Sequence, residues 1–484
     1  MAERGVVAAG HPLTARVGAD VLRAGGNAVD AGVAAMATSF MTEPLMTGLG
    51  AGGYLLVAPP GGEPVLLDFF VESPGRGVDP SALAPLQPVE VCFGDAVQVF
   101  HVGGASCAVY GVPAGMAAAG ERFGTVPLAD LVAPAARLAR GGVVVNREQA
   151  HLFSLLAGII ASAPESRRAY QVDGRLPREG DLLRDPDLAD ALDRLGAEGA
   201  APFYTGDIAA AISDLVLERG GALSREDLAA YRVVAREPLR VRYRGREVYT
   251  NPPPSAGGLL LVDALAMLDQ TPGPPDELAL VRAVLTAQQA GTGDLTAVVP
   301  PAERLGSTTH ISVLDADGWM CSVTCSNGQG SGLVVPGTGV HVNNMLGEED
   351  LSPQGLLSHP PGRRLPSMMA PTAAFRDGVP ELVLGSAGSN RIRSTLLQVV
   401  VNTIDRDLGV QQAVDAPRLH AQDGVVFAEP GIDVDALRAA GYPVTPFSAR
   451  NAFFGGCQAV RRHPYTGMLS GGGDPRRGGA VVVA

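Results

Sequence analysis

The segment STTHISVLDADGWMCSVTCS, residues 307–326, alternates apolar and polar side chains on both sides of an Asp-Ala-Asp-Gly turn at 315–318. A period of two is typical of β-strands, and a short turn rich in Asp and Gly between two such runs is typical of a hairpin. If the turn centres there, paired residue numbers sum to roughly 633 to 635, which places Thr308 opposite positions 325–327. The sequence therefore predicts that Ser326 lies beside Thr308.

Thr308 is a candidate nucleophile, but a threonine hydroxyl attacks poorly unless a base takes its proton. One solution places the threonine at a chain N-terminus, where its own α-amine is the base. That solution requires the peptide bond between Ser307 and Thr308 to be cut. His310 lies close by, but a second base beside an N-terminal nucleophile would be redundant, so we interpret it as a packed core residue.

Composition restricts the class of protein. The chain has 484 residues, 46 % of them hydrophobic, with 62 glycines and 38 prolines, which favours a loop-rich globular protein of one large layered domain or of two or three domains. A net charge of −13 disfavours nucleic acid and anionic membrane surfaces as partners. Every basic residue is Arg, which excludes mechanisms that need a lysine.

No metal, cofactor or membrane span is predicted. The histidines show no HExxH or HxH spacing, and the cysteines form no CxxC pair. We interpret the cysteines as small buried hydrophobic residues; they are Cys92, Cys107, Cys321, Cys325 and Cys457. No window offers 18 uninterrupted apolar residues, and no apolar stretch follows a basic start, so we expect a soluble, cytoplasmic protein.

The order of predicted elements favours sheets covered by helices on both sides. Two helices broken at Gly25–Asn27 come first, followed by a hairpin around Pro59–Gly62. Residues 113–240 are mainly helical, a further helix follows the NPPPSAGG loop, and residues 271–303 are predicted to be a linker. The last third mixes strands with two helices, RIRSTLLQVVVNTIDRD and DVDALRAAG.

The region of Thr308 resembles the precursor cleavage site of the gamma-glutamyltranspeptidase family of N-terminal-nucleophile hydrolases. The resemblance rests on STTHISV and GSGLVVPGTGVHVNN, and it extends to HPLTARVGADVLRAGGNAVDAGVAA, EPLMTGLGAGGYLLV, NPPPSAGG, PSMMAPT, GSAGSNRI and GGGDPRRGGA. It implies an α+β fold, a four-layer αββα sandwich, made as one precursor that cuts itself between Ser307 and Thr308. The fragments 1–307 and 308–484 would stay together in one unit.

The same resemblance implies roles for individual residues. Thr308 would be the nucleophile and, through its freed α-amine, the base, while Ser326 takes the place of a second threonine that orients the nucleophile. Gly388 and Ser389 match an oxyanion hole of backbone N–H groups. Each such donor lowers the activation barrier by roughly 3 kcal/mol. The residues expected at the substrate site are Phe70, Asn327, Glu348, Glu349, Ser367 and Met368.

Three departures from the family pattern surround the acyl pocket. Phe70 stands where the family has an Arg that pairs with the α-carboxylate of a glutamyl substrate. The acidic residue that grips the substrate's α-ammonium is displaced, with Glu348 or Glu349 as candidates, and Met368 replaces the second of two serines after Ser367. We infer that the chemistry is retained while the acyl group has changed.

Several alternatives stay open. The protein could be a γ-glutamyl hydrolase or transferase, or an acylase for another small-molecule amide, with water or an amine as the acceptor. A family member that has lost catalysis and acts as a binding or structural protein is the alternative from a different class. The processed units could also pair as a homodimer.

Overall fold

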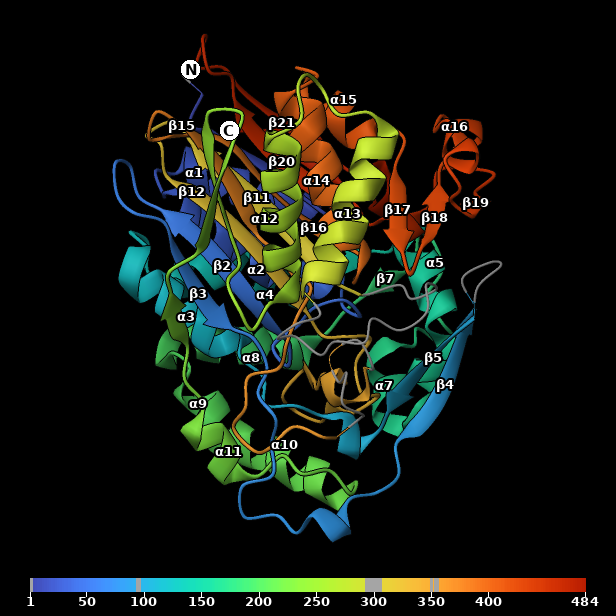
Figure 1. Cartoon of the computed structure of the whole chain (residues 1–484). Coiled ribbons are helices and arrows are strands. Elements are labelled where there is room, and N and C mark those ends of the chain that lie inside the picture. Colours follow the sequence, from blue (N-terminus) through green and yellow to red (C-terminus); the bar gives the residue numbers. More distant parts are fainter. Residues whose placement is uncertain (1–2, 93–96, 292–306, 349–350, 352–356) are drawn as a thin grey trace.

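In the computed structural model of the chain, two antiparallel β-sheets pack face to face, and helices cover the outer face of each (Figure 1). The structure describes residues 3–92, 97–291, 307–348, 351 and 357–484. This arrangement is the four-layer form of an α+β protein, and it confirms the fold class predicted from the sequence.

The two large sheets contain strands from both halves of the chain. The first has the order β22 (Ala480–Val483), β1 (Gly5–Ala9), β11 (Thr309–Asp315), β12 (Met320–Ser326), β2 (Gly52–Ala58), β3 (Val65–Phe69) and β8 (Val234–Arg236). The second has the order β21 (Leu469–Gly473), β20 (Gly456–Arg462), β16 (Val379–Ala387), β15 (Thr372–Arg376), β10 (Arg246–Thr250) and β9 (Leu239–Tyr243). Smaller sheets join β4 (Gln87–Cys92) to β5 (Val97–Val102), β6 (Val143–Val144) to β7 (Leu182–Leu183), β13 (Val334–Val335) to β14 (Val340–His341), and β17 (Leu419–Gln422) to β18 (Val425–Ala428) and β19 (Val444–Pro446).

The helices form the outer layers and an extension beside the first sheet (Figure 1). On the side of the first sheet lie α1 (Pro12–Arg23), α2 (Ala28–Thr42), α3 (Val112–Phe123), α4 (Leu128–Gly141) and α8 (Pro186–Glu198). On the second sheet lie α12 (Ala256–Asp269), α13 (Glu277–Gly291), α14 (Arg391–Ile404) and α15 (Val410–Asp415). The others are α5 (Arg147–Leu155), α6 (Ala157–Ser162), α7 (Pro164–Tyr170), α9 (Ala201–Tyr204), α10 (Asp207–Glu218), α11 (Arg225–Ala230) and α16 (Val434–Ala439).

The central hairpin has the predicted register. Strands β11 and β12 pair antiparallel from Thr309 with Cys325 to Leu314 with Met320, around the predicted turn. Because side chains alternate along a strand, odd-numbered residues of this hairpin point to the helices and even-numbered residues point to the second sheet. Ile311 thus packs in the core below α2, whereas the Ser312 hydroxyl donates to the Gln458 carbonyl of β20 at 3.0 Å.

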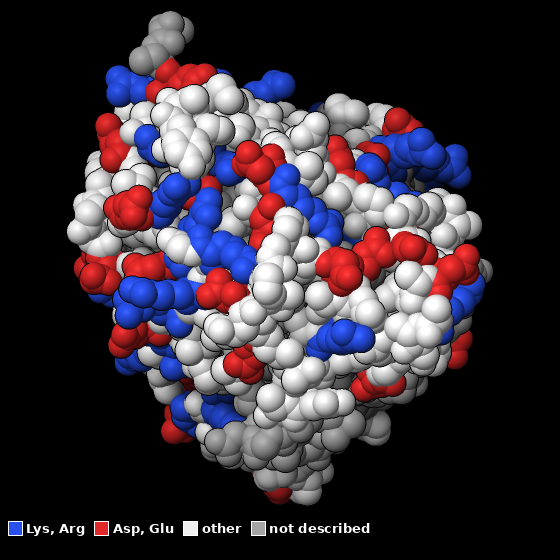
Figure 2. All heavy atoms as spheres, turned by 45° about the horizontal axis from the view of Figure 1, so that its top comes forward, with Lys and Arg blue, Asp and Glu red and all other residues white. Residues whose placement is uncertain are grey.

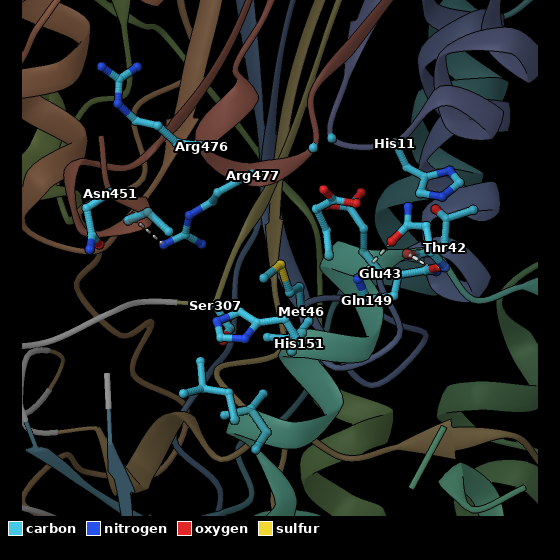
Figure 3. Close-up of a pocket in the computed structure, with 18 residues that line it drawn as sticks. His11, Thr42, Glu43, Met46, Gln149, His151, Ser307, Asn451, Arg476 and Arg477 are labelled. Carbon is cyan, nitrogen blue, oxygen red and sulfur yellow. Dashed lines mark hydrogen bonds between the residues drawn. The ribbon is translucent and has the colours of Figure 1, made fainter. Parts of the chain in front are cut away.

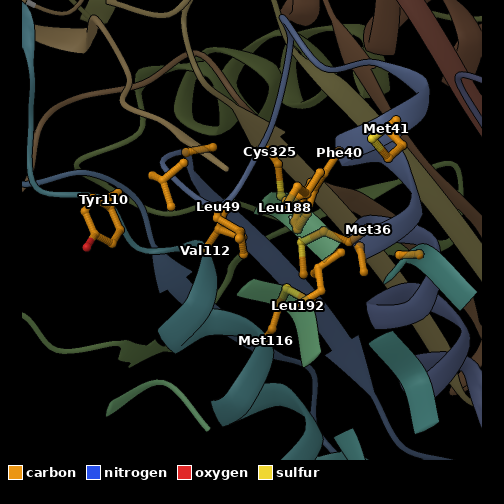
Figure 4. Close-up of a cluster of buried hydrophobic side chains, with 14 of the residues drawn as sticks. Met36, Phe40, Met41, Leu49, Tyr110, Val112, Met116, Leu188, Leu192 and Cys325 are labelled. Atoms are coloured by element: carbon orange, nitrogen blue, oxygen red, sulfur yellow. Dashed lines mark hydrogen bonds between the residues drawn. The ribbon is translucent and has the colours of Figure 1, made fainter. Parts of the chain in front are cut away.

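The core on the helical side is built around α2, which is buried along its whole length. Asn27 and Asp30 form a capping box at its start, directly after the predicted break between the two helices. The thiol of Cys325 lies 3.1 Å from the sulfur of Met36, and Figure 4 shows α2 side chains beside Leu188 of α8. The four cysteines whose side chains the structure describes are free and buried, as the sequence predicts.

His310 is a structural residue between the two sheets, which agrees with its interpretation as a core residue. Its ring nitrogens lie 2.7 Å from the Thr324 hydroxyl and 2.9 Å from the Ser312 hydroxyl, and burial lowers its pKa to about 3. A neutral imidazole is therefore held between hydroxyls. Gly385 of β16 makes room for it, since a Cβ there would lie 2.2 Å from the ring.

The predicted linker at 271–303 is wrong over much of its length, because α13 occupies Glu277–Gly291. The first three prolines of this stretch come before Asp276, whose carboxylate accepts from the N–H of Ala279 at 2.7 Å and so caps the helix. Leu280, Val281 and Val284 are then buried against the second core. Residues 292–303 lie outside the described part of the chain.

Other predicted elements are confirmed. Strands β2 and β3 form the hairpin around Pro59–Gly62, and residues 113–240 are mainly helical. On the face shown in Figure 2, arginine side chains lie beside carboxylates. Within the described ranges, no helix is both long enough and apolar enough to span a bilayer.

Gly385→Ala tests the close approach of the sheets at His310. A methyl group there would overlap the imidazole, so we expect the free energy of unfolding to fall by about 1–3 kcal/mol. Thermal or urea denaturation followed by circular dichroism would measure it. Gly120→Ala in α3 is the matched control, because no atom lies within 4 Å of the added carbon. Equal stability of the two variants would contradict the packing described here.

Candidate active site

Ser307, Thr308 and Ser326 meet at one end of the central hairpin, as its register predicts. Thr308 immediately precedes β11, Ser326 ends β12, and each side chain is about 5 % exposed. The Ser326 hydroxyl donates to the Ser307 carbonyl at 2.5 Å and accepts from the Gly328 N–H at 3.1 Å. In the uncut chain, Ser326 therefore contacts the carbonyl of the peptide bond before Thr308, where a donor polarises the carbon for attack.

A small cavity of about 30 Å³ lies beside this peptide bond and contains most of the predicted substrate residues. Six of its twelve lining residues are apolar and six are polar. The lining residues are Phe70, Ser307, Thr308, Ser326, Met345, Glu348, Leu351, Ser367, Met368, Met369, Ser389 and Ile392. Segments far apart in the sequence thus meet around Thr308.

The predicted oxyanion residues, Gly388 and Ser389, form the turn between β16 and α14. Both have positive φ, 126° for Gly388 and 49° for Ser389. A Cβ at Gly388 would lie 2.8 Å from the Cα of Gly455, so only glycine fits there. Ser389 lines the cavity just before α14, whose N-terminus carries partial positive charge. The position suits a developing oxyanion, and the oxyanion role stays a prediction.

Phe70 fills the wall where the family resemblance leads one to expect an arginine. Its ring stacks on Tyr54, with centroids 5.4 Å apart and planes inclined by 22°. The nearby Arg364 lies behind the backbone of Phe70: it donates to the Phe70 carbonyl and, at 2.7 Å, to the Tyr231 hydroxyl. Its guanidinium is also 3.5 Å from Asp68. The Arg364 guanidinium therefore binds groups in the protein interior, behind Phe70.

The remaining predicted substrate residues differ in position. Glu348 reaches over Gly328, where a Cβ would lie 2.6 Å from its Oε1, and Ser367 and Met368 also line the cavity. Asn327 is fully buried, and its amide donates to the His341 carbonyl at 3.3 Å. Asn327 therefore lies outside the cavity lining, and Glu349 lies outside the described residues.

Glu43 is a residue near the site that sequence reasoning missed. Its Oε2 accepts a hydrogen bond from the Thr309 hydroxyl at 2.8 Å. Burial raises its pKa to about 7, although that hydrogen bond and the charge of Arg477 act in the opposite direction. The partners are 266 positions apart, so no local pattern relates them. The sequence signal that could have drawn attention to Glu43 is an acidic residue directly after the apolar helix α2.

Glu43 also borders a second, larger cavity of about 400 Å³, in which Figure 3 shows Glu43, Ser307 and Arg477. Ser307 lines both cavities, so both reach the residue directly before Thr308. Among the described residues, no group of three or more His, Cys, Asp or Glu side chains is arranged to hold a metal ion.

Comparisons with known proteins show the family of the chain. The gamma-glutamyltranspeptidase family model matches residues 14–290 and 278–484. The Acylase ACY 1 proenzyme of Pseudomonas sp. (strain SE83) is 32 % identical over 533 residues, covering 99 % of this chain and 93 % of that protein. The Glutathione hydrolase proenzyme of Escherichia coli (strain K12) is 30 % identical over 534 residues, covering 98 % and 91 %.

A solved structure is similar over the same extent. The cephalosporin acylase from Bacillus halodurans superposes with a TM-score of 0.84 at 27 % identity, covering 99 % of this chain and 96 % of that one. Family match, sequence similarity and fold all extend over nearly the whole chain. The protein therefore belongs to the gamma-glutamyltranspeptidase family of N-terminal-nucleophile hydrolases.

Proposed function

We propose that this chain is a precursor that cuts itself between Ser307 and Thr308, and that the freed Thr308 is the nucleophile of an amidohydrolase or acyltransferase. The observation that carries the proposal is the hydrogen bond from Ser326 to the Ser307 carbonyl beside a buried Thr308. The proenzyme names of two relatives support a precursor in this family.

The proposed chemistry needs no group beyond the chain itself. The α-amine of Thr308 takes the proton of its hydroxyl, and the oxygen attacks the substrate's amide carbon. The N–H groups of Gly388 and Ser389 receive the developing negative charge. The amine component leaves with the proton returned by the α-amine, and water or an amine then takes the acyl group from the Thr308 ester.

The fragments 1–307 and 308–484 would stay together because each large sheet contains strands of both fragments. In the first sheet, β11 of the smaller fragment pairs with β1 of the larger one, and β12 pairs with β2. In the second sheet, β10 pairs with β15 in the same way. Separating the fragments would break these ladders and expose the core between the sheets.

The apolar half of the cavity lining favours an acyl group without a free α-carboxylate. Phe70 offers such a carboxylate no charge-assisted hydrogen bond, a loss of roughly 2 kcal/mol. The lining residues Phe70, Met345, Met368 and Ile392 instead suit an apolar acyl chain. Glu348 would attract a cationic or N–H group on that chain. Two relatives named as acylases support this choice over a γ-glutamyl donor.

Self-cleavage is tested by the mass of the purified chain under denaturing conditions. We expect fragments 1–307 and 308–484, with the smaller one beginning Thr-Thr-His. Thr308→Ala should stay uncut, and Ser326→Ala should cut at least about tenfold more slowly, since a donor to the reacting carbonyl is lost. Ser331→Ala is the matched control, because this nearby buried hydroxyl binds the Val342 carbonyl instead. An uncut wild-type chain would favour the inactive-homologue alternative.

Acyl specificity is tested by kcat/KM for amides that share one chromogenic amine. We expect an unbranched apolar acyl group to be preferred over a γ-glutamyl group by about 30-fold, the equivalent of about 2 kcal/mol. Phe70→Arg should narrow this ratio, whereas Phe70→Leu should keep it. If Phe70→Arg folds, shown by circular dichroism, and leaves the ratio unchanged, the determinant of specificity lies elsewhere in the cavity.

A further inference from the structure

Glu43 and the residues that follow it contact both strands of the central hairpin, at the end where Thr308 and Ser326 lie. It follows the last residue of α2, and its carboxylate accepts from the hydroxyl of Thr309, the residue after the nucleophile. Its carbonyl accepts from the N–H of Met46 at 2.9 Å, and the Met46 carbonyl accepts from the N–H of Asn327 at 2.9 Å. One short segment thus holds the residues that directly follow Thr308 and Ser326.

The surroundings of Glu43 leave its carboxylate little freedom. A Cβ at Gly10 would lie 2.4 Å from its Oε1, so the backbone just after β1 closes one side. The charged and titratable residues that share the larger cavity with it are His11, Glu148, His151, Arg476 and Arg477. Burial lowers the pKa of His11 to about 4 and that of Arg477 to about 10, so near neutral pH His11 is uncharged and Arg477 is charged.

We propose that Glu43 is the positioning residue of self-cleavage: its ionised carboxylate holds Thr309 so that the Thr308 hydroxyl is presented to the Ser307 carbonyl carbon. This inference rests on the proposed function. Thr308 lies just before β11 and Thr309 is the first residue of that strand. Their side chains point to opposite faces, so fixing the Thr309 side chain also limits the rotation of Thr308. The rate of self-cleavage depends on placing the Thr308 hydroxyl to within a fraction of an ångström, so a contact that fixes Thr309 can affect that rate.

The step itself is an N-to-O acyl shift followed by hydrolysis. The Thr308 oxygen forms a bond to the Ser307 carbonyl carbon, the bond from that carbon to the Thr308 nitrogen breaks, and the hydroxyl proton ends on the nitrogen. Water then attacks the ester, which yields the Ser307 carboxylate and restores the Thr308 hydroxyl. The larger cavity borders both Ser307 and Glu43, and it is roomy enough to bring that water to the ester.

Ionisation of Glu43 should therefore set the pH dependence of self-cleavage. A carboxylate accepts a hydrogen bond more strongly than a protonated carboxyl group does. With a pKa of about 7, the ionised fraction rises as the pH rises. We expect the cleavage rate to increase by about tenfold between about pH 6 and about pH 8.

The experiment follows cleavage by mass spectrometry after uncut, denatured chain is diluted into buffers across this pH range, with folding checked by circular dichroism. Glu43→Gln keeps an acceptor for Thr309 but cannot titrate, so its cleavage rate should lose the rise with pH. Glu43→Ala and Thr309→Val should each slow cleavage at least about tenfold, and the double variant should be no slower than either. Asp263→Asn on α12, where burial likewise raises the pKa of the carboxyl group, is the control and should keep the wild-type profile.

The outcomes separate this inference from the proposal on which it rests. A wild-type rate and pH profile in folded Glu43→Gln would overturn the role of Glu43. Strictly additive slowing in the double variant would also overturn it, because Glu43 and Thr309 would then act independently. Cleavage of Thr308→Ala at the same bond would instead overturn the assignment of the nucleophile.

Discussion

The antiparallel pairing of β11 with β12 is the interaction on which the site depends. It places Thr308 and Ser326 at the same end of the hairpin, and it brings the Ser326 hydroxyl to the Ser307 carbonyl. A shift of one residue would turn every side chain of one strand to the opposite face. Burial on both faces of the hairpin prevents such a shift, because apolar residues fill one side and a chain of hydroxyls around His310 fills the other.

Strand alternation also separates two environments around the peptide bond before Thr308. On the side of the second sheet lies the small cavity, where Phe70, Met345 and Ile392 surround the candidate nucleophile. On the helical side, Thr309 meets the Glu43 carboxylate, which borders a larger cavity lined by both polar and apolar residues. The first environment suits recognition of an acyl chain, and the second suits water and proton exchange.

Both large sheets contain strands from before and after Thr308, which would keep the fold stable if the chain were cut there. In the first sheet these strands are interleaved, and in the second they meet at β15 and β10, so a cut before Thr308 would leave the ladders and both cores in place. An ion pair also joins the two parts of the chain, since Arg244 lies 2.7 Å from Asp405. A free α-amine can thus be produced without loss of the surrounding structure.

The sequence by itself determined the elements and relations that depend on local period and spacing. These include the hairpin with its register, the capped helix α2, the αββα class through its resemblance to a family, and most residues of the cavity beside Thr308. Only the tertiary structure decided the rest: that α13 packs on the second core, that Phe70 stacks on Tyr54, and that Glu43 binds Thr309. The physical reason is that such contacts join residues far apart in the chain, and their energy comes from burial that no local window of sequence can show.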